Sequence, residues 1–458
     1  MRHARPTIRT ALAASAARVT ALTTVLITAL ATVLITALAT ALAAGPADAS
    51  GPLPEPIWQS SWEAQGDPDE ARVYLIDSVL DPVTGDVFAL ARHSEVSDRL
   101  LLRRVDGETG ATEWERPQDA SAYSRLTLDA DARQLLLFEQ VSLAGKPPLR
   151  LHALGVDGET RWSRDLGSFG YAQEQVTDPA SGTTCTATVT ARPRTSGSGS
   201  RRGLRWTIGC VARDGEVVAL RSFDRSGSAD QDELGLAVDS RRGRWYAALS
   251  RVVPGRSSTV EVQALDQHGR TRWRRTLTEG PREFRDFGAL TVDPKRGRVL
   301  LGTSTYGGGK VSRGALTVWE GNGRRHAQRT WHSPRGGTIS DLAVSQDGRH
   351  YVVASLGTTR GATITALRPS LRQRWTTRHT RQPVDHLDLV LDDAQRRILV
   401  AGGRLAAYRW NGSPTWAGRP VRTYLPLRLH LDTERQRLVS AWQEDYWPAA
   451  HLTAWQLE

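Results

Sequence analysis

The chain has 458 residues, and the stretch from Ser50 to Glu458 still has 409, which is more than one compact core usually contains. The length therefore predicts several domains or a repeat architecture. The formal net charge is +11, and the excess of 57 Arg over 3 Lys is typical of a GC-rich genome; because the arginines are spread along the sequence, we expect no nucleic-acid partner. One Met and two Cys exclude a Met-rich groove, a cysteine-ligated iron–sulfur cluster and a four-cysteine zinc site.

Residues 1–49 are predicted to be a signal peptide. Arginines up to Arg18 precede an uncharged stretch that ends in a small-x-small cleavage pattern before Ser50. Residues 24–31 are repeated as 32–39, which makes the apolar stretch long enough to span a bilayer, so an uncleaved N-terminal anchor is the alternative. Both interpretations place residues 50–458 outside the cytoplasm, secreted or held at the membrane only through the anchor.

Residues 50–458 contain a repeat in which an apolar strand ends in Asp, a turn follows, and a second apolar strand begins. Successive marker residues are 40 to 61 positions apart, the usual length of a four-stranded propeller blade with variable loops. An Asp at this place accepts hydrogen bonds from the backbone of the turn, so we interpret the markers as structural. The eight markers are Asp81, Asp129, Asp178, Asp239, Asp293, Ser345, Asp392 and Asp432.

A second element of the repeat is a Gly turn followed by Trp, which we predict to connect the third and fourth strands of a blade. Each Trp is expected to pack between neighbouring blades and to bury about 150–250 Å². Two copies have lost the Trp. The predicted blade-docking residues are Trp114, Trp162, Trp273, Trp375 and Trp416.

The two ends of the repeat region complement each other. The eighth copy stops at Glu458 before its fourth strand, and residues 56–62 look like a fourth strand with no third strand before it. Joining them closes a ring and removes an exposed strand edge. The sequence therefore predicts an all-β, eight-bladed β-propeller of four-stranded antiparallel blades. Seven blades are the alternative, if the irregular third copy, 178–235, is an insertion.

The stretch from Arg104 to Trp114 resembles the tryptophan-docking motif of the pyrroloquinoline-quinone-like propeller repeat, with Arg104 where the motif has Ala. The resemblance implies either a quinone-dependent dehydrogenase or a non-catalytic scaffold. Quinoproteins of this family carry a vicinal disulfide and a Ca²⁺ site beside the quinone, and neither is recognisable here; a Cys-x-x-Cys-His haem motif is also missing. We therefore expect the non-catalytic branch, without a cofactor, a metal site or catalytic residues.

The two cysteines, Cys185 and Cys210, are expected on the second and third strands of one blade, opposite each other across a hairpin. In an oxidising compartment they should form a disulfide, which stabilises the fold by about 3 kcal/mol through loop-closure entropy. Two buried thiols and a redox-active pair are the alternatives.

Ligands of propellers are expected at the mouth of the central channel, where the first strand of each blade begins. Four positions before the marker, two copies have Gly235 and Ala289, and the other six have charged residues that could form a polar ring. A channel lined with solvated charges is the alternative. The candidate binding residues are Asp77, Arg125, Glu174, Asp341, Asp388 and Arg428.

Taken together, these features predict an exported, non-enzymatic, monomeric propeller that binds a protein or a glycan, or acts as a scaffold, at the cell envelope. The alternative is an extracytoplasmic enzyme, either a quinone-dependent dehydrogenase or a carbohydrate-active enzyme, with its active site on the propeller axis.

Overall fold

The computed structural model describes residues 51–63, 73–93, 100–118, 124–140, 148–168, 171–191, 203–226, 234–251, 258–278, 283–307, 313–332, 337–357, 361–382, 384, 386–418, 423–444 and 449–457. The predicted signal peptide lies outside these residues. In the described ranges the regular elements are 32 strands, which form eight four-stranded antiparallel sheets. No helix among these residues is long and apolar enough to cross a membrane.

The first four blades follow in chain order, each listed from its inner to its outer strand. Blade 1 consists of β2 (Val73–Leu80), β3 (Val87–His93), β4 (Leu100–Val105) and β5 (Thr112–Gln118). Blade 2 consists of β6 (Arg125–Asp129), β7 (Gln134–Gln140), β8 (Pro148–Gly155) and β9 (Thr160–Ser168). Blade 3 consists of β10 (Tyr171–Thr177), β11 (Thr184–Ala191), β12 (Gly203–Val211) and β13 (Val217–Ser226). Blade 4 consists of β14 (Leu234–Asp239), β15 (Arg244–Arg251), β16 (Thr259–Asp266) and β17 (Thr271–Thr278).

The last four blades continue the series, and the eighth takes its outer strand from the N-terminal end. Blade 5 consists of β18 (Glu283–Asp293), β19 (Arg298–Gly307), β20 (Arg313–Glu320) and β21 (Arg325–His332). Blade 6 consists of β22 (Thr338–Val344), β23 (Tyr351–Leu356), β24 (Ala362–Leu367) and β25 (Gln373–Thr380). Blade 7 consists of β26 (Asp388–Asp392), β27 (Arg397–Ala401), β28 (Leu405–Arg409) and β29 (Pro414–Gly418). Blade 8 consists of β30 (Thr423–Asp432), β31 (Arg437–Glu444), β32 (Ala449–Gln456) and β1 (Pro56–Glu63).

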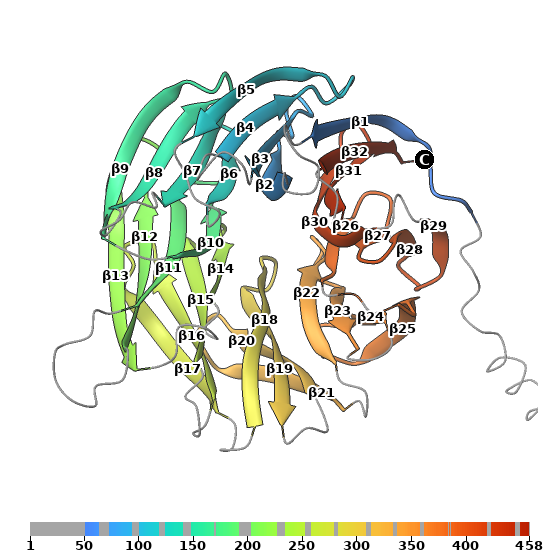
Figure 1. Cartoon of the computed structure of the whole chain (residues 1–458). Coiled ribbons are helices and arrows are strands. Elements are labelled where there is room, and N and C mark those ends of the chain that lie inside the picture. The colour runs from blue at the N-terminus through green and yellow to red at the C-terminus, as the bar shows by residue number, and fades with distance from the viewer. Residues whose placement is uncertain are drawn as a thin grey trace, which may run out of the picture. The chain divides into compact units, whose positions relative to one another are not determined.

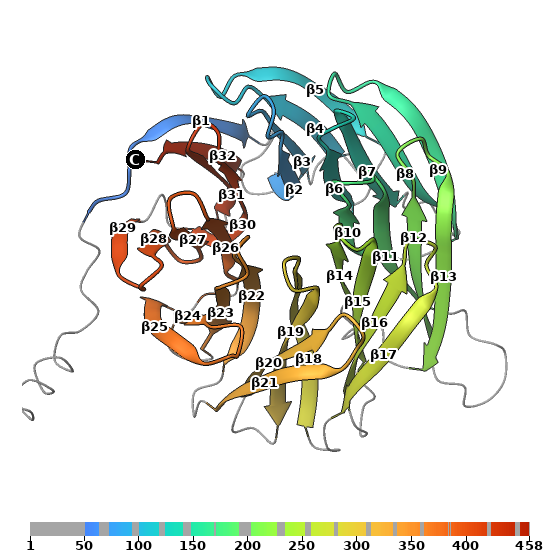
Figure 2. The same ribbon diagram turned by 180° about the vertical axis from the view of Figure 1, so that it is seen from behind.

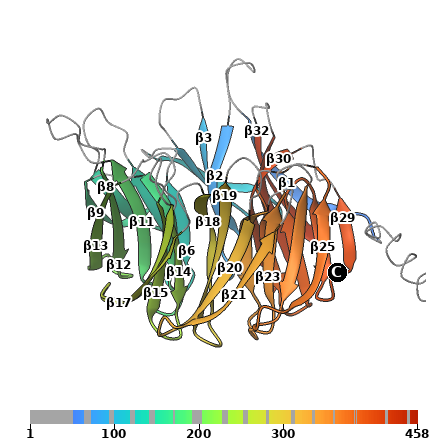
Figure 3. The same cartoon turned by 90° about the horizontal axis from the view of Figure 1, so that it is seen from below.

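The inner strands contact one another around a complete circle, from β2 through β6, β10, β14, β18, β22, β26 and β30 back to β2. Figures 1 and 2 show this circle from its two sides, with the fourth strand of each blade at the rim. Figure 3 shows that the strands run between the two faces of the ring. The eight-bladed propeller is therefore confirmed. The seven-bladed alternative is wrong, because residues 178–235 contain three strands of a complete blade 3.

The predicted ring closure is also confirmed. Strand β1 pairs antiparallel with β32, with Ser60 opposite Leu452 and Trp62 opposite Ala450. Trp58 and Trp62 are buried in one apolar cluster with residues of β2, β3, β31 and β32. The two ends of the propeller chain thus complete one sheet and share its core.

The marker residues fold the turn between the first and second strands of each blade. The Asp81 carboxylate, which is 1% exposed, accepts hydrogen bonds from Val83 N at 2.9 Å and from Thr84 Oγ1 at 3.0 Å. Arginines neutralise six of these buried carboxylates: Arg133 with Asp81, Arg213 with Asp129, Arg242 with Asp239, Arg296 with Asp293, Arg397 with Asp392 and Arg435 with Asp432. A buried carboxylate held in this way supports the turn.

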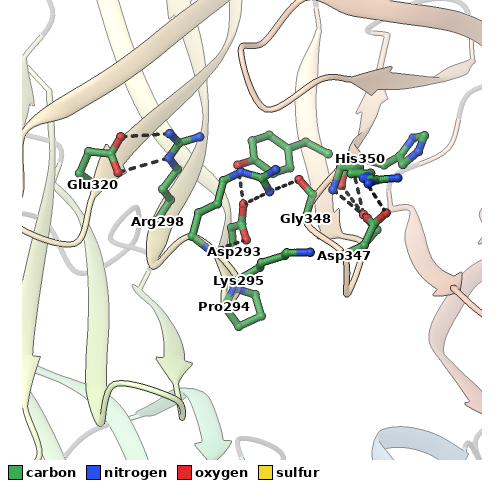
Figure 4. Close-up of polar contacts among 12 residues, drawn as sticks. Asp293, Pro294, Lys295, Arg298, Glu320, Asp347, Gly348 and His350 are labelled. Atoms are coloured by element: carbon green, nitrogen blue, oxygen red, sulfur yellow. Dashed lines mark hydrogen bonds and ion pairs between the residues drawn. The ribbon is translucent and has the colours of Figure 1, made fainter.

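Some of these arginines also cross to the next blade. Between blades 5 and 6, Arg296 donates to Asp293 Oδ2 at 3.1 Å and to the carbonyl of Gly348. Figure 4 shows Asp293 and Gly348 connected in this way, with the Arg298–Glu320 pair beside them. One guanidinium therefore joins the marker of one blade to the corresponding turn of its neighbour.

The tryptophans of the outer strands dock onto the turn between the third and fourth strands of the next blade. At Gly110, where φ is +74°, a Cβ would lie 2.8 Å from the Trp58 ring, so only glycine fits. Five indole N–H groups each donate to a backbone carbonyl of that turn: Trp58 to Gly107 at 2.9 Å, Trp114 to Val156 at 3.1 Å, Trp162 to Arg213 at 3.1 Å, Trp273 to Gly321 at 2.8 Å and Trp375 to Trp410 at 2.7 Å.

Trp416 differs from the other predicted docking residues because blade 8 has no such turn; its third strand, β32, leads to the end of the chain. The Trp416 ring, which is 9% exposed, instead lies in an apolar cluster with Trp455 and Leu457, and Leu53 packs against this cluster. The segment before β1 therefore occupies the place of the missing turn.

The predicted disulfide bond is present, between Cys185 on β11 and Cys210 on β12. The two residues are directly opposite each other in the register of these strands, and both are buried in the apolar cluster of blade 3. The bond links two central strands of one blade.

Removing residues 50–64 should lower the melting temperature by about 10 °C or more, because the deletion exposes the apolar face that two buried Trp side chains cover. Thermal unfolding followed by circular dichroism is the measurement. A control chain that carries residues 50–64 after Glu458 should regain the lost stability, since β1 would then follow β32 as a hairpin. An unchanged melting temperature in the deletion would contradict the closure.

Replacing both cysteines by alanine should lower the free energy of unfolding by about 3 kcal/mol, because the unfolded chain regains the entropy of an open loop. Urea unfolding measures the change, and unreduced peptide mapping should recover Cys185 joined to Cys210. Wild-type protein unfolded under reducing conditions is the control and should match the double variant. Equal stability with and without reductant would contradict a structural bond.

Candidate functional site

A recess of about 650 Å³, lined by charged and polar residues together with aliphatic ones, lies along the inner strands β26, β30, β2, β6 and β10 of five consecutive blades. Five of the six predicted channel residues line it: Asp77, Arg125, Glu174, Asp388 and Arg428. The sixth, Asp341, is not part of the lining and lies on β22, in the blade next to that of Asp388. The predicted ring is therefore gathered mainly on one side of the axis.

A local irregularity of the inner strands precedes several of these residues. The pairing register of the first and second strands shifts just before Asp77, Glu174, Asp341 and Arg428. Such a bulge bends a strand and redirects the side chain that follows it. The charged residues thus stand at positions where the regular alternation of the strand is interrupted.

Three carboxylates at this position fasten their blade to the next one. The Asp77 carboxylate accepts from Ser78 N and from Leu126 N, both at 3.0 Å. Asp341 repeats this pattern with Leu342 N at 2.7 Å and Leu389 N at 2.8 Å, and Asp388 accepts from Leu429 N. In each case one donor belongs to the first strand of the following blade, so the carboxylate holds two inner strands in register.

Two guanidinium groups and Glu174 supply the other charges of the recess. Arg428 Nε lies 3.4 Å from Asp77 Oδ1, and Asp77 is the main cause that raises the pKa of Arg428, against the opposing effect of burial. Burial raises the pKa of Glu174, while Arg428 and Arg125 oppose that shift. Arg125 donates to the carbonyl of Ser124 at 3.0 Å. The recess therefore combines three carboxyl groups with two permanent cations.

His430 and Ser78 also line the recess, although the sequence did not single them out. Ser78 Oγ and His430 Nε2 are 2.8 Å apart, and removal of the ring from water lowers the pKa of His430 to about 4. A neutral imidazole can both donate and accept a hydrogen bond. His430 stands two positions before its marker, on the same face as Arg428, so strand alternation was the signal that could have found it.

Threonine and glutamine extend the polar lining onto β6 and β10. Thr127 Oγ1 accepts from Gln175 Nε2 and from Thr177 Oγ1, both at 2.8 Å. Thr127 also stands two positions before its marker. The site therefore offers hydroxyl, amide, imidazole and guanidinium groups to a ligand, held by hydrogen bonds within and between blades.

No group of three or more His, Cys, Asp or Glu side chains that could hold a metal ion is found among the described residues. The cysteines are on facing strands, 25 positions apart in sequence, and bonded to each other, so they do not form the vicinal disulfide that accompanies a quinone.

Comparisons with known proteins agree on the fold alone. No protein-family model matches the chain, and no curated protein matches it in sequence. A solved structure titled "Structure of Dos1 propeller" is similar over 88% of this chain and 96% of its own, with 9% identity and a TM-score of 0.53. At that identity the similarity shows a β-propeller and says nothing about a ligand.

The contribution of Asp341 to stability should fall as the pH rises from 7 to 8. Burial, and then Asp388, raise the pKa of Asp341 to about 8, so the folded chain binds this proton more tightly than the unfolded chain does. The fall is at most about 1.4 kcal/mol per pH unit. Histidines with a lowered pKa, such as His430 at about 4, act in the opposite direction near pH 7, because the unfolded chain still binds part of a proton at each of them and the folded chain does not.

The variant Asp388→Asn removes the neighbouring charge and should flatten this decrease, as measured by urea unfolding between pH 6.5 and 8.5. An exposed carboxylate on the outer rim, changed in Glu159→Gln, is the matched control and should leave the slope unchanged. The same slope in Asp388→Asn as in the wild type would contradict the coupling.

Proposed function

We propose that this protein is an exported, non-catalytic β-propeller that binds a protein or glycan ligand, or acts as a scaffold, at the cell envelope, with the recess between blades 7, 8, 1, 2 and 3 as its binding site. The observation that carries the proposal is the use of the carboxylates. The carboxylates of Asp77 and Asp388 accept hydrogen bonds from backbone N–H groups of the following blade. This role fixes the shape of the recess and does not require a reactive acid or base. A recess organised before binding reduces the entropy that a ligand must lose.

The groups that remain for a ligand are cations, hydrogen-bonding side chains and aliphatic residues such as Val79 and Val390. Arg125, Arg428 and His430 suit a partner that presents a carboxylate together with hydroxyl or amide groups. Among the residues that the structure describes, the lining includes no Phe, Tyr or Trp, so a sugar would be held there by hydrogen bonds and charge and not by ring stacking.

We also infer that the chain belongs to the non-catalytic branch of the pyrroloquinoline-quinone-like propellers. The docking of Trp58 and Trp114 onto the turn of the next blade supports this lineage, since it gives a physical role to the motif that carries the resemblance. A disulfide between two buried strand residues fits a protein that folds in an oxidising compartment, which supports export.

A second candidate function is hydrolysis on the side of blade 2, and one chain of hydrogen bonds favours it. His152 Nδ1 lies 2.7 Å from Ser163 Oγ, and His152 Nε2 lies 2.6 Å from the buried Glu139 carboxylate. A nucleophile, a base and an orienting acid are thus connected. If this network of Glu139, His152 and Ser163 is catalytic, a fluorophosphonate probe should label Ser163 in the wild type and should not label the His152→Ala variant. Absence of labelling in the wild type would show that the network only connects neighbouring strands.

Site-specific photo-crosslinking tests the binding role. Benzoylphenylalanine in place of Thr433, an exposed residue of the recess lining, should give a light-dependent adduct with a cell-envelope component in cells that export the protein. The same amino acid in place of Leu220, exposed at 51% on β13, is the control and should give none. N-terminal sequencing of the exported protein should begin at Ser50.

The double variant Arg125→Gln, Arg428→Gln should abolish the adduct at Thr433, because both cations that face the ligand are lost. Its melting temperature should be measured alongside, so that loss of binding is separated from unfolding. An adduct that persists in the folded double variant, or that forms only from Leu220, would contradict the recess as the binding site.

A further inference from the structure

The outer strands of three consecutive blades carry an unusual concentration of arginine. Residues 270–278, 324–332 and 372–382, which cover β17, β21 and β25 with their adjoining turns, include no Asp or Glu. Figures 1 and 2 show these strands on neighbouring blades at the rim of the ring. They carry Arg270, Arg272, Arg274, Arg275, Arg324, Arg325, Arg329, Arg372, Arg374, Arg378 and Arg381. Arginines that are spread along the sequence are thus gathered in space.

One position shows that this concentration is more than a bias of composition. Arg270, Arg324 and Arg372 each follow the left-handed residue of the turn before the outer strand, which is Gly269, Gly323 or Leu371. At the equivalent position four other blades have small or acidic residues, namely Ala111, Glu159, Glu216 and Ser413. The same turn therefore accepts either sign of charge, and blades 4 to 6 consistently carry the cation.

Most of these arginines are open to solvent. Arg270, Arg324 and Arg372 are exposed, and the structure places no described carboxylate within ion-pair distance of them. Arg272 pairs with Asp266 at 3.2 Å and Arg274 with Glu261 at 3.5 Å, both at the solvent-exposed side of blade 4. These two carboxylates are outnumbered by the arginines of the three strands, so the surface keeps a positive net charge.

Two arginines of the group have a different task. Arg275 Nε donates to the carbonyl of Gly323 at 2.7 Å, and Arg329 Nη1 donates to the carbonyl of Leu371 at 2.9 Å. These two hold the turn of the next blade. We therefore define the basic wall as the nine others: Arg270, Arg272, Arg274, Arg324, Arg325, Arg372, Arg374, Arg378 and Arg381.

We propose that the basic wall binds an anionic polymer of the cell surface whose charge is carried by repeated phosphate groups. Guanidinium groups recognise phosphate through two parallel hydrogen bonds, and several of them on three neighbouring strands can engage successive groups of one chain. Trp273 and Trp375 on these strands are docked against the next blade, so they are not platforms on which nucleic-acid bases could stack. The choice of a cell-surface polymer rests on the proposed export.

Binding of purified mature protein to poly(glycerol phosphate) and to single-stranded DNA with the same number of phosphates should be measured by calorimetry at several NaCl concentrations. We expect the base-free polymer to bind at least as tightly as the DNA, with an affinity that falls steeply with salt. The triple variant Arg270→Gln, Arg324→Gln, Arg372→Gln should reduce the slope of log affinity against log salt by about 2, at about 0.7 for each lost contact.

The control variant Arg161→Gln, Arg241→Gln, Arg349→Gln loses the same net charge from other parts of the propeller and should bind like the wild type. Equal weakening in both triple variants would show non-specific attraction and overturn the proposal, as would failure of the wild type to bind the polymer. Binding of DNA alone would assign the wall to nucleic acid. None of these results depends on the recess, since Arg125 and Arg428 are unchanged in every protein compared.

Discussion

The fastening of each blade to the next is the constraint on which the propeller depends. A single four-stranded sheet with two apolar faces cannot bury them alone, so each blade is stable only between its neighbours. Apolar contact between flat faces allows sliding, and directional hydrogen bonds remove that freedom. The indole N–H of Trp114 does this at the rim, and the carboxylate of Asp77 does it near the axis. The closing blade obeys the same rule, since Trp58 on β1 docks onto blade 1.

The same fastening shapes the recess. Asp77, Asp341 and Asp388 hold adjacent inner strands, whereas the equivalent positions in blades 4 and 5 have Gly235 and Ala289. At Gly235 a Cβ would lie 2.3 Å from the Phe287 ring, so this blade has no room for a charged side chain facing the axis. The polar lining is consequently concentrated on the opposite blades. The Phe287 ring thus accounts for the missing charge at one position of the circle, and Ala289 leaves a second position without one.

What the sequence could predict is what the repeat encodes locally. The marker Asp, the Gly turn and the strand lengths recur, and they predicted the blade count, the closure through β1 and the pairing of Cys185 with Cys210 across a hairpin. Contacts that occur at only one blade carry no such periodic signal. The place of Trp416 depends on a turn that blade 8 lacks, and the polar partner of His430 is Ser78, 352 positions away. The gathering of arginines on three outer strands also appears only when the blades are placed beside one another.

Arginine has two physical roles in this chain, and its geometry explains why one residue type serves both. In the strand that follows a turn, Arg275 reaches the carbonyl of Gly323 in the next blade while its planar group lies near the Trp273 ring, 6.0 Å from its centre. A lysine ammonium could meet the charge but would not combine a directed N–H with a flat stacking surface. Six residues after the left-handed turn position, as at Arg275, the side chain reaches the neighbouring blade; directly after that position, as at Arg270, it is exposed to solvent. A difference of a few residues along one strand therefore separates an arginine that joins blades from one that is free to bind a partner.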